Sequence, residues 1–347
     1  MTTIHGLTPW WEPIRSHIQA LQLSPASDGI AIACCGSVEE IALFSSGYIG
    51  SPKFARQPLI TEHTMFQLAS ISKFITACLV LELCLRGKLQ LDEKIIPPNN
   101  LLDVPVSFGQ LLSHRAGFVD IGGIFGTIKN STTGWTFDYW QNNKFRLYQS
   151  EKVGDYNYST WGYWLIQVLI EWKFKVPFEH LLKKFLCYPL GLVSTTSSSP
   201  NSYNGNYSWG HDSLGKPLPY GWRHFEGFEA AAGVWSTAAD MALLISHLFK
   251  PKGTNSRDTK LLLSLQDLIA IPSCCGYQYG LLLSSINSEK VLLHTGTNPG
   301  YHAILQFCPK TKNGFIILTN SECRNIFNQS LVKYMGRLMV DTAGLAL

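Results

Sequence analysis

Two groups of apolar runs, at opposite ends of the chain, have the pattern of β-strands. The first group covers residues 29–34 and 39–45, and the polar turn Gly36-Ser37 between them is typical of an antiparallel pair. Strand-like runs return only near the C-terminus, at residues 278–284, 291–294, 303–307 and 315–319. The two groups predict one antiparallel sheet to which both ends of the chain contribute.

Helical periodicity dominates the rest of the chain. Apolar residues recur at three- and four-residue spacing from Ser70 to about Arg86, and Gly87 is placed to end that helix. We therefore predict an α/β fold of the α+β type, in which helices flank the antiparallel sheet and a mainly helical lobe is inserted. Further helices are predicted at residues 8–21, 108–114, 163–172, 177–186, 238–249 and 325–338.

The separation of the strands into two groups predicts two subdomains. Residues 1–90 and 245–347 form the sheet subdomain in this prediction, and residues 91–244 form the helical lobe. The chain has 347 residues, of which 46% are hydrophobic, so it is long and apolar enough to bury a large core.

Charge and composition exclude several classes of function. The formal net charge is +4, and no basic run exceeds Lys183-Lys184, so no surface for nucleic acid or for anionic membranes is predicted. Neither an export signal nor a membrane-spanning stretch is recognisable. We predict a soluble, cytoplasmic protein that binds neither nucleic acid nor membranes, and the sequence does not indicate its oligomeric state.

The cysteines and histidines point to no metal or cofactor. The nine cysteines are an odd number, and no Cys-x-x-Cys pair occurs among them. This usage is typical of a reducing compartment. The ten histidines lack the spacing of a metal-binding motif.

Residues 66–77 hold a hydroxyl and an amine three positions apart at the start of a predicted helix. Ser70 and Lys73 share one helix face, so the amine can approach the hydroxyl. Serine needs such a neighbour, because its hydroxyl is a weak nucleophile until a base takes the proton. The same Ser-x-x-Lys spacing occurs twice more, at Ser213/Lys216 and Ser330/Lys333, where a loop and a solvated helix face explain it.

Two later segments carry further candidates. Tyr156 and Tyr158 directly precede a predicted helix, and either phenol can serve for packing or as a general base. Residues 294–300, His-Thr-Gly-Thr-Asn-Pro-Gly, end a strand-like run, and their simplest interpretation is a hairpin turn.

Three motifs together resemble the serine β-lactamase and penicillin-binding-protein family, in particular its class C, DD-peptidase and family VIII esterase branch. They are Ser70-Ile71-Ser72-Lys73, Tyr158-Ser159-Thr160 and His294-Thr295-Gly296, in the family's order. Residues 111–118, 189–192 and 231–240 are similar to further family blocks, so the resemblance extends over about residues 29–319.

The resemblance implies a β-lactamase/transpeptidase-like fold and an acyl-enzyme on Ser70. Lys73 would assist as a base and Tyr158 would pass the proton to the leaving group, although Tyr156 stays an alternative. The main-chain N–H groups of Ser70 and Thr297 would form the oxyanion hole. The resemblance also places substrate-binding roles on Thr160, His294, Thr295, Gly296 and Thr297.

Three departures from the family narrow the expected function. Thr160 stands where β-lactamases have Asn, His294 stands where they have Lys, and the export signal of cell-wall enzymes is not recognisable. The resemblance therefore implies an intracellular serine hydrolase that acts on small-molecule esters, as a carboxylesterase does, or on amides. The alternative is an acyltransferase or peptide cyclase, for example in secondary metabolism, and a β-lactamase, a DD-peptidase or an inactive binding protein is less favoured. The aromatic residues Trp135, Phe137, Tyr139 and Trp140 fit an acyl pocket or core packing equally well.

Overall fold

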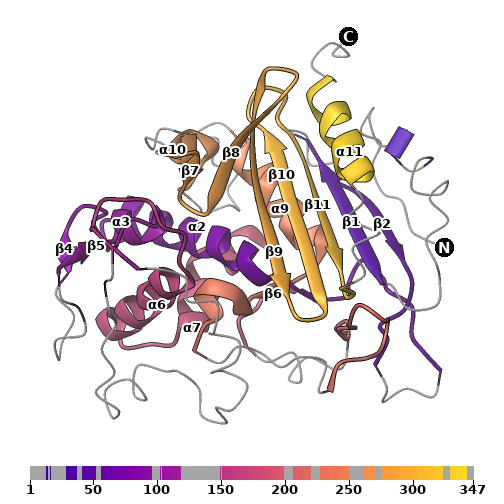
Figure 1. Ribbon diagram of the computed structural model, residues 1–347, viewed down its shortest axis with the longest axis horizontal. Coiled ribbons are helices and arrows are strands. Elements are labelled where there is room, and N and C mark those ends of the chain that lie inside the picture. The colour runs from indigo at the N-terminus through magenta and orange to yellow at the C-terminus, as the bar shows by residue number, and fades with distance from the viewer. Residues whose placement is uncertain are drawn as a thin grey trace.

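A central sheet with helices on both faces organises the computed structural model (Figure 1). The structure describes residues 13–14, 16, 29–36, 41–51, 56–95, 102, 104–118, 149, 151–198, 206–219, 227–250, 262–269, 275–322 and 329–341. The predicted helix at residues 8–21, except for three positions, and the aromatic residues 135–140 lie outside this part of the chain.

The sheet has seven strands in the order β2-β1-β11-β10-β9-β8-β7, and all neighbours are antiparallel. The first strand, β1, pairs with the last one, β11, so that Ile30 lies opposite Thr319. This pairing confirms the predicted antiparallel sheet built from both ends of the chain. The strands are β1 (Ile30–Cys35), β2 (Ile41–Ser46), β7 (Tyr277–Gln278), β8 (Leu281–Ile286), β9 (Glu289–Asn298), β10 (Tyr301–Cys308) and β11 (Asn313–Thr319).

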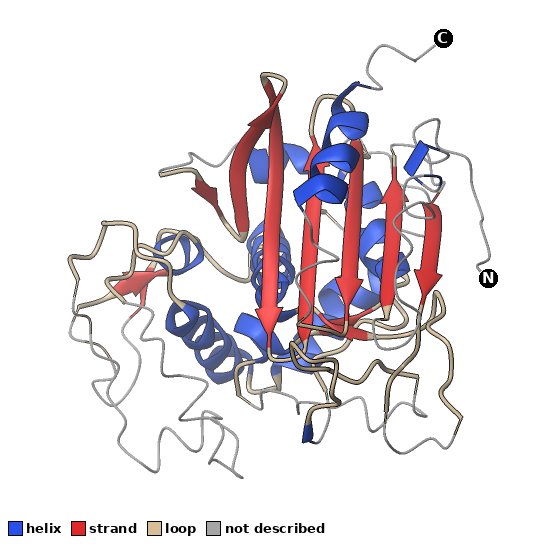
Figure 2. Cartoon of the chain, turned by 45° about the vertical axis from the view of Figure 1, so that its right-hand side comes forward, coloured by secondary structure: helices blue, strands red, loops and turns tan. Residues whose placement is uncertain are grey.

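Strand β1 is apolar on both faces of the sheet, so both faces must be packed against other elements. Every residue of β1 is buried, with Ile30, Ile32 and Cys34 in one apolar cluster and its remaining residues in the other. Helix α11 (Gln329–Asp341) covers the first face, and α2 (Ser72–Leu85) and α9 (Ala238–Leu248) contribute to the cluster on the second (Figure 2). No helix in the described part of the chain has both the length and the apolar character needed to cross a lipid bilayer.

Beside this sheet, shorter elements surround helix α6 (Thr160–Phe174) (Figure 1). Residues 162–170 of α6 are all buried, as expected of a helix that is apolar on every side. The predicted division into two subdomains stays a prediction. The helices here are α3 (Phe108–Leu112), α7 (Phe178–Leu182), α8 (Tyr188–Leu190) and the π-helices η3 (Lys183–Cys187) and η6 (Glu229–Gly233), whereas α10 (Leu265–Ile269) lies near β7 (Figure 1).

Two small antiparallel sheets connect these elements. Strand β3 (Phe66–Gln67) pairs with β6 (Trp235–Ser236), and β4 (Lys94–Ile95) pairs with β5 (Val106–Ser107). Directly after β3, residues 69–71 form the 3₁₀ turn η1 (Ala69–Ile71), which leads into α2. The segment with the candidate nucleophile is therefore held between a short sheet and a buried helix.

Candidate active site

Ser70 lies in the tight turn η1, directly before α2. The preceding residue, Ala69, is fully buried and has a φ of +48°, in the left-handed region that side chains disfavour. Val234 holds this turn from both sides: its carbonyl accepts from the Leu68 N–H at 2.9 Å, and its N–H donates to the Ser72 hydroxyl at 3.0 Å. Strained main chain of this kind occurs at functional sites, where the surrounding structure fixes it.

The Lys73 side chain connects this turn to η6. Its Nζ donates to the Ser70 Oγ at 3.1 Å and to the Ala231 carbonyl at 3.0 Å. Lys73 is completely buried, whereas Ser70 is partly exposed. The hydroxyl is therefore accessible to a substrate from outside, while the amine contacts it from the interior.

The main-chain carbonyl groups of the π-helix η6 accept hydrogen bonds from three side chains. Besides Lys73, Thr76 donates to the Ala230 carbonyl at 2.7 Å, and Asn298 donates to the Ala232 carbonyl at 3.0 Å. The Ala230 N–H in turn donates to the side chain of Gln167 at 3.0 Å. The wider winding of a π-helix, which is frequent at functional sites, holds the buried lysine in place here.

The edge of β9 forms the opposite wall of the site. Strand β8 pairs with β9 only as far as Leu293, so the following residues have a strand partner, β10, on one side alone. This edge lies against the Ser70 turn: a Cβ atom on Gly296 would lie 2.2 Å from the Leu68 carbonyl oxygen and 3.2 Å from the Ser70 nitrogen. Only glycine permits this approach. Residues 294–298 are strand, and the hairpin turn that the composition of residues 294–300 suggested is confined to Pro299 and Gly300, between Asn298 and its β10 partner Tyr301.

His114 positions the segment of the candidate tyrosine through two hydrogen bonds. Its main-chain carbonyl accepts from the Asn157 N–H at 2.8 Å, and its Nδ1 accepts from the Ser159 N–H at 3.0 Å. Its ring centroid lies 4.4 Å from that of Tyr158 and 6.2 Å from that of Tyr156. His114 belongs to the family-like block at residues 111–118, but its sequence context indicates no role, because nothing there places it next to a segment 45 residues away.

Of the two tyrosines, Tyr158 lies nearer to the lysine. The Lys73 Nζ is 5.0 Å from the centroid of the Tyr158 ring. No contact of this kind joins Lys73 to Tyr156 among the described residues, and burial together with the charges of Tyr158 and Cys275 raises the pKa of Tyr156. A raised pKa leaves less of Tyr156 as phenolate at neutral pH, so less of it is available as a base.

His294 and Tyr277 complete the buried side of the site. The Nδ1 of His294 donates to the Thr295 carbonyl at 2.6 Å, and its Nε2 lies 3.5 Å from the hydroxyl of Tyr277. Burial, and next the charge of Lys73, lower the pKa of His294 to about 3. Burial, Lys73 and His294 likewise hold the pKa of His114 well below its ordinary value. Both imidazoles are thus neutral at neutral pH, and Lys73 is the one basic group among the side chains named in this site.

The structure brings most of the predicted site residues together. Ser70, Lys73 and Tyr158 surround one point, and the His294 ring centroid lies 6.5 Å from that of Tyr158. Thr160 is the partly exposed first residue of α6. Along β9, Thr295 and Thr297 are exposed, whereas His294, Gly296 and Asn298 are buried.

Comparison with known proteins finds similarity over most of the chain. The family model described as Beta-lactamase matches residues 18–329. A beta-lactamase from Pseudomonas fluorescens is 30% identical over 179 residues, which cover 48% of this chain and 46% of the relative. The chain spans about half the length of the curated relatives it matches.

Three solved structures share the fold at low identity. A penicillin-binding protein homologue from Pyrococcus abyssi, described as octameric, has a TM-score of 0.75 at 20% identity, over 95% of this chain and 77% of its own. D-amino acid amidase from Ochrobactrum anthropi SV3 has a TM-score of 0.73 at 21% identity, over 95% and 99%. A class C beta-lactamase mutant has a TM-score of 0.75 at 17% identity, over 94% and 97%. This likeness confirms the fold that the sequence predicted.

Proposed function

The chain belongs to the beta-lactamase family, and from this premise we propose that it is a serine hydrolase that forms an acyl-enzyme on Ser70. The observation that carries the proposal is the 3.1 Å contact between the Lys73 amine and the Ser70 hydroxyl, with the amine buried and the hydroxyl accessible. A nucleophile paired with a base in this way is the arrangement that covalent catalysis requires.

In the proposed reaction, the Ser70 oxygen attacks a substrate carbonyl as Lys73, acting as the base, takes the hydroxyl proton. The new bond joins Oγ to the carbonyl carbon, and the bond to the leaving group then breaks. Tyr158 passes a proton to that leaving group, which departs as an alcohol or an amine. Water afterwards attacks the ester on Ser70 and releases the free acid. The position of the Tyr158 ring beside Lys73 supports its assignment.

We assign the oxyanion hole to the main-chain N–H groups of Ser70 and Thr297. The close approach of β9 to the turn at Gly296 supports this assignment, because it brings both stretches of main chain to one place. A donor in such a position is typically worth about 3–4 kcal/mol of transition-state stabilisation. Thr295 and Thr297 are exposed on the same edge and are the proposed contacts for the rest of the substrate.

Esters are the proposed substrate class. A neutral His294 offers no permanent positive charge to a substrate carboxylate, and Thr160 lacks a carboxamide to bind a substrate amide. Small amides are the second class, because one neighbour of the same fold is described as a D-amino acid amidase.

A fluorophosphonate probe followed by intact-mass analysis tests the proposal. One adduct should form, on Ser70, and it should be absent from the Ser70→Ala variant. A panel of short acyl esters, with and without amine acceptors, then identifies the product. Free acid alone supports a hydrolase, and an amide product indicates acyl transfer instead. An unlabelled Ser70, under conditions that label a known serine hydrolase, contradicts the proposed acyl-enzyme.

A further inference from the structure

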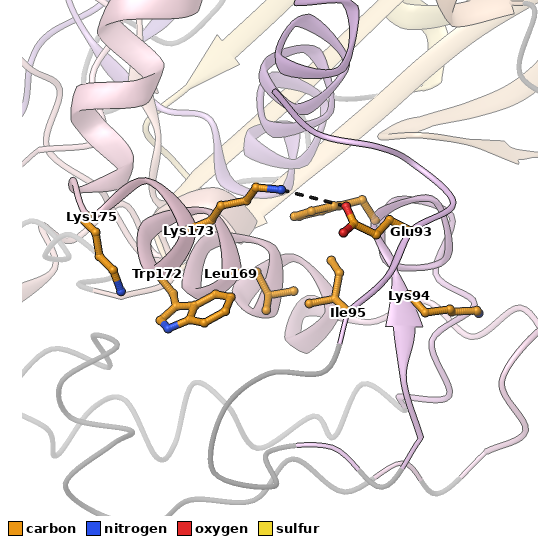
Figure 3. A pocket seen from close by; sticks show the side chains of 8 residues that line it. Glu93, Lys94, Ile95, Leu169, Trp172, Lys173 and Lys175 are labelled. Carbon is orange, nitrogen blue, oxygen red and sulfur yellow. Dashed lines mark ion pairs between the residues drawn. The ribbon is translucent and has the colours of Figure 1, made fainter. Parts of the chain in front are cut away.

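A groove outside the active site lies between β4, α3 and the last turns of α6 (Figure 3). Its volume of about 460 Å³ is within the range of about 300–1,000 Å³ that is usual for small-molecule sites. Ile95, Phe108, Leu169 and Trp172 contribute apolar side chains to its lining. Phe108 and Leu169 are buried, so the floor of the groove is a continuation of the core.

Basic side chains outnumber acidic ones in the groove. Lys94, Lys173 and Lys175 line it together with Glu93, which leaves an excess of positive charge. The Nζ of Lys173 lies 4.0 Å from Glu93, and the two side chains are 41% and 52% exposed. Such an exposed ion pair contributes little stability. Glu93 therefore offsets only a small part of the positive charge of the groove.

The other two lysines have no carboxylate partner among the described residues. Lys94 donates to the neutral Gln110 side chain at 2.6 Å, and the Lys175 Nζ lies 5.4 Å from the centroid of the Trp172 ring. Lys173 and Lys175 come from the end of α6, where cations are favoured. Figure 3 shows that the Lys173 amine points toward Glu93, whereas Lys175 lies beside Trp172, so an anionic group at the Trp172 end of the groove meets Lys175. An apolar floor beside these charges complements a molecule with an apolar chain and one negative head group.

The groove is separate from the Ser70 site. Helix α6 begins at Thr160, beside Tyr158, and the groove uses positions 169–175 at its other end. At about 1.5 Å of rise per residue, roughly 14–22 Å lies between them along the helix axis. A substrate on Ser70 therefore does not fill the groove.

We propose that this groove binds a medium-chain alkyl carboxylate, with the chain along Ile95, Phe108 and Leu169 and the carboxylate beside Lys175, at the Trp172 end of the groove. The binding does not depend on the reaction at Ser70. Chain length contributes through burial of methylene groups, and the carboxylate contributes through its contact with Lys175.

Calorimetric titration of the purified protein with octanoate, decanoate and dodecanoate tests the proposal. Each added pair of methylene groups should tighten binding by up to about tenfold while the chain stays within the groove. Decyltrimethylammonium, with the same chain and the opposite charge, should bind at least tenfold more weakly than decanoate. Equal affinity for the two decyl compounds would overturn the proposal.

Two charge-matched double variants locate the site. Lys173→Gln with Lys175→Gln should weaken decanoate binding at least tenfold. Lys184→Gln with Lys216→Gln removes the same charge from exposed positions outside the groove and should leave binding unchanged. Equal effects of the two pairs, or binding that only an active-site ligand displaces, would show that decanoate binds elsewhere. If decanoate does not bind and Ile95→Asp dissociates an oligomer in sedimentation, a second copy of the chain occupies the groove instead.

Discussion

The imidazole of His114 accepts a hydrogen bond from the main-chain N–H of Ser159 at 3.0 Å. Ser159 lies between the candidate base Tyr158 and Thr160, the first residue of α6. One buried side chain, located directly after α3, thus fixes the direction in which the tyrosine segment enters its helix. The acceptor role of Nδ1 requires a neutral ring with its proton on Nε2, in agreement with the lowered pKa of His114.

Replacing Ser70 or Lys73 by alanine should abolish most turnover. Groups that act as one unit lose most of their effect when one member is removed, so we expect each variant to lose about a thousandfold or more in kcat. Ester hydrolysis measures this loss, and thermal unfolding should show that Ser70→Ala stays folded. Ser213→Ala and Ser330→Ala change exposed serines with the same spacing to a lysine and should be nearly silent. Substantial activity of Ser70→Ala, with the same product, is incompatible with the assignment.

Tyr158→Phe should be far less active than Tyr156→Phe. Phenylalanine keeps the ring against His114 but removes the oxygen that carries the proton, so the loss should appear in kcat more than in the free energy of unfolding. Steady-state kinetics with one ester, alongside denaturant unfolding, compares the two variants. If Tyr156→Phe is the inactive one, the proton transfer must be reassigned to Tyr156.

Gly296→Ala should damage the site although it adds one methyl group. The new Cβ would lie 2.2 Å from the Leu68 carbonyl oxygen, a main-chain atom that cannot rotate away, so β9 must move from the Ser70 turn. A misplacement of about 1 Å near a reacting group costs on the order of a hundredfold in rate. Gly36→Ala is the matched control, because its Cβ would meet only an Asn313 side-chain atom at 3.4 Å. Equal kcat/KM for Gly296→Ala and the unmodified protein would refute the tight approach.

Stability should fall as the pH drops below about 6.5, partly because of His294. In the unfolded chain its imidazole binds a proton near pH 6.5, whereas in the folded protein it stays neutral down to about pH 3. Between these values the unfolded state binds more protons, so the free energy of unfolding decreases by up to about 1.4 kcal/mol per pH unit. Urea unfolding at pH 7, 6 and 5 measures the slope, which should be flatter in His294→Gln. Identical slopes would mean that the folded His294 titrates normally.

Local patterns were enough to predict most of the fold. The apolar runs at residues 29–34 and 315–319 identified strands that the structure pairs, and the three-residue spacing of Ser70 and Lys73 already implied their contact. The predicted helix start at Ser70 is corrected, because the α-helix starts at Ser72 and Ser70 lies in a 3₁₀ turn.

Contacts between distant segments were not predictable in the same way. The composition of residues 294–300 indicated a turn, which forms only at Pro299 and Gly300, but it gave no sign that Gly296 lies against the distant Ser70 turn. The π-helix η6 and the hydrogen bond from Ser159 to His114 likewise depend on tertiary packing. No periodicity in the sequence reports such contacts.

The pairing of β1 with β11 also has a consequence for protein synthesis. The Gly29 N–H donates to the side chain of Asn320, 291 positions later, so the sheet is completed only after those further residues have been translated. At about 5–20 residues per second, the ribosome needs roughly fifteen seconds to a minute to cover that interval. Until then one edge of β1 has no strand to pair with, and its isoleucines and cysteines are open to chaperones and to aggregation. The synthesis of β11 thus decides whether β1 is buried.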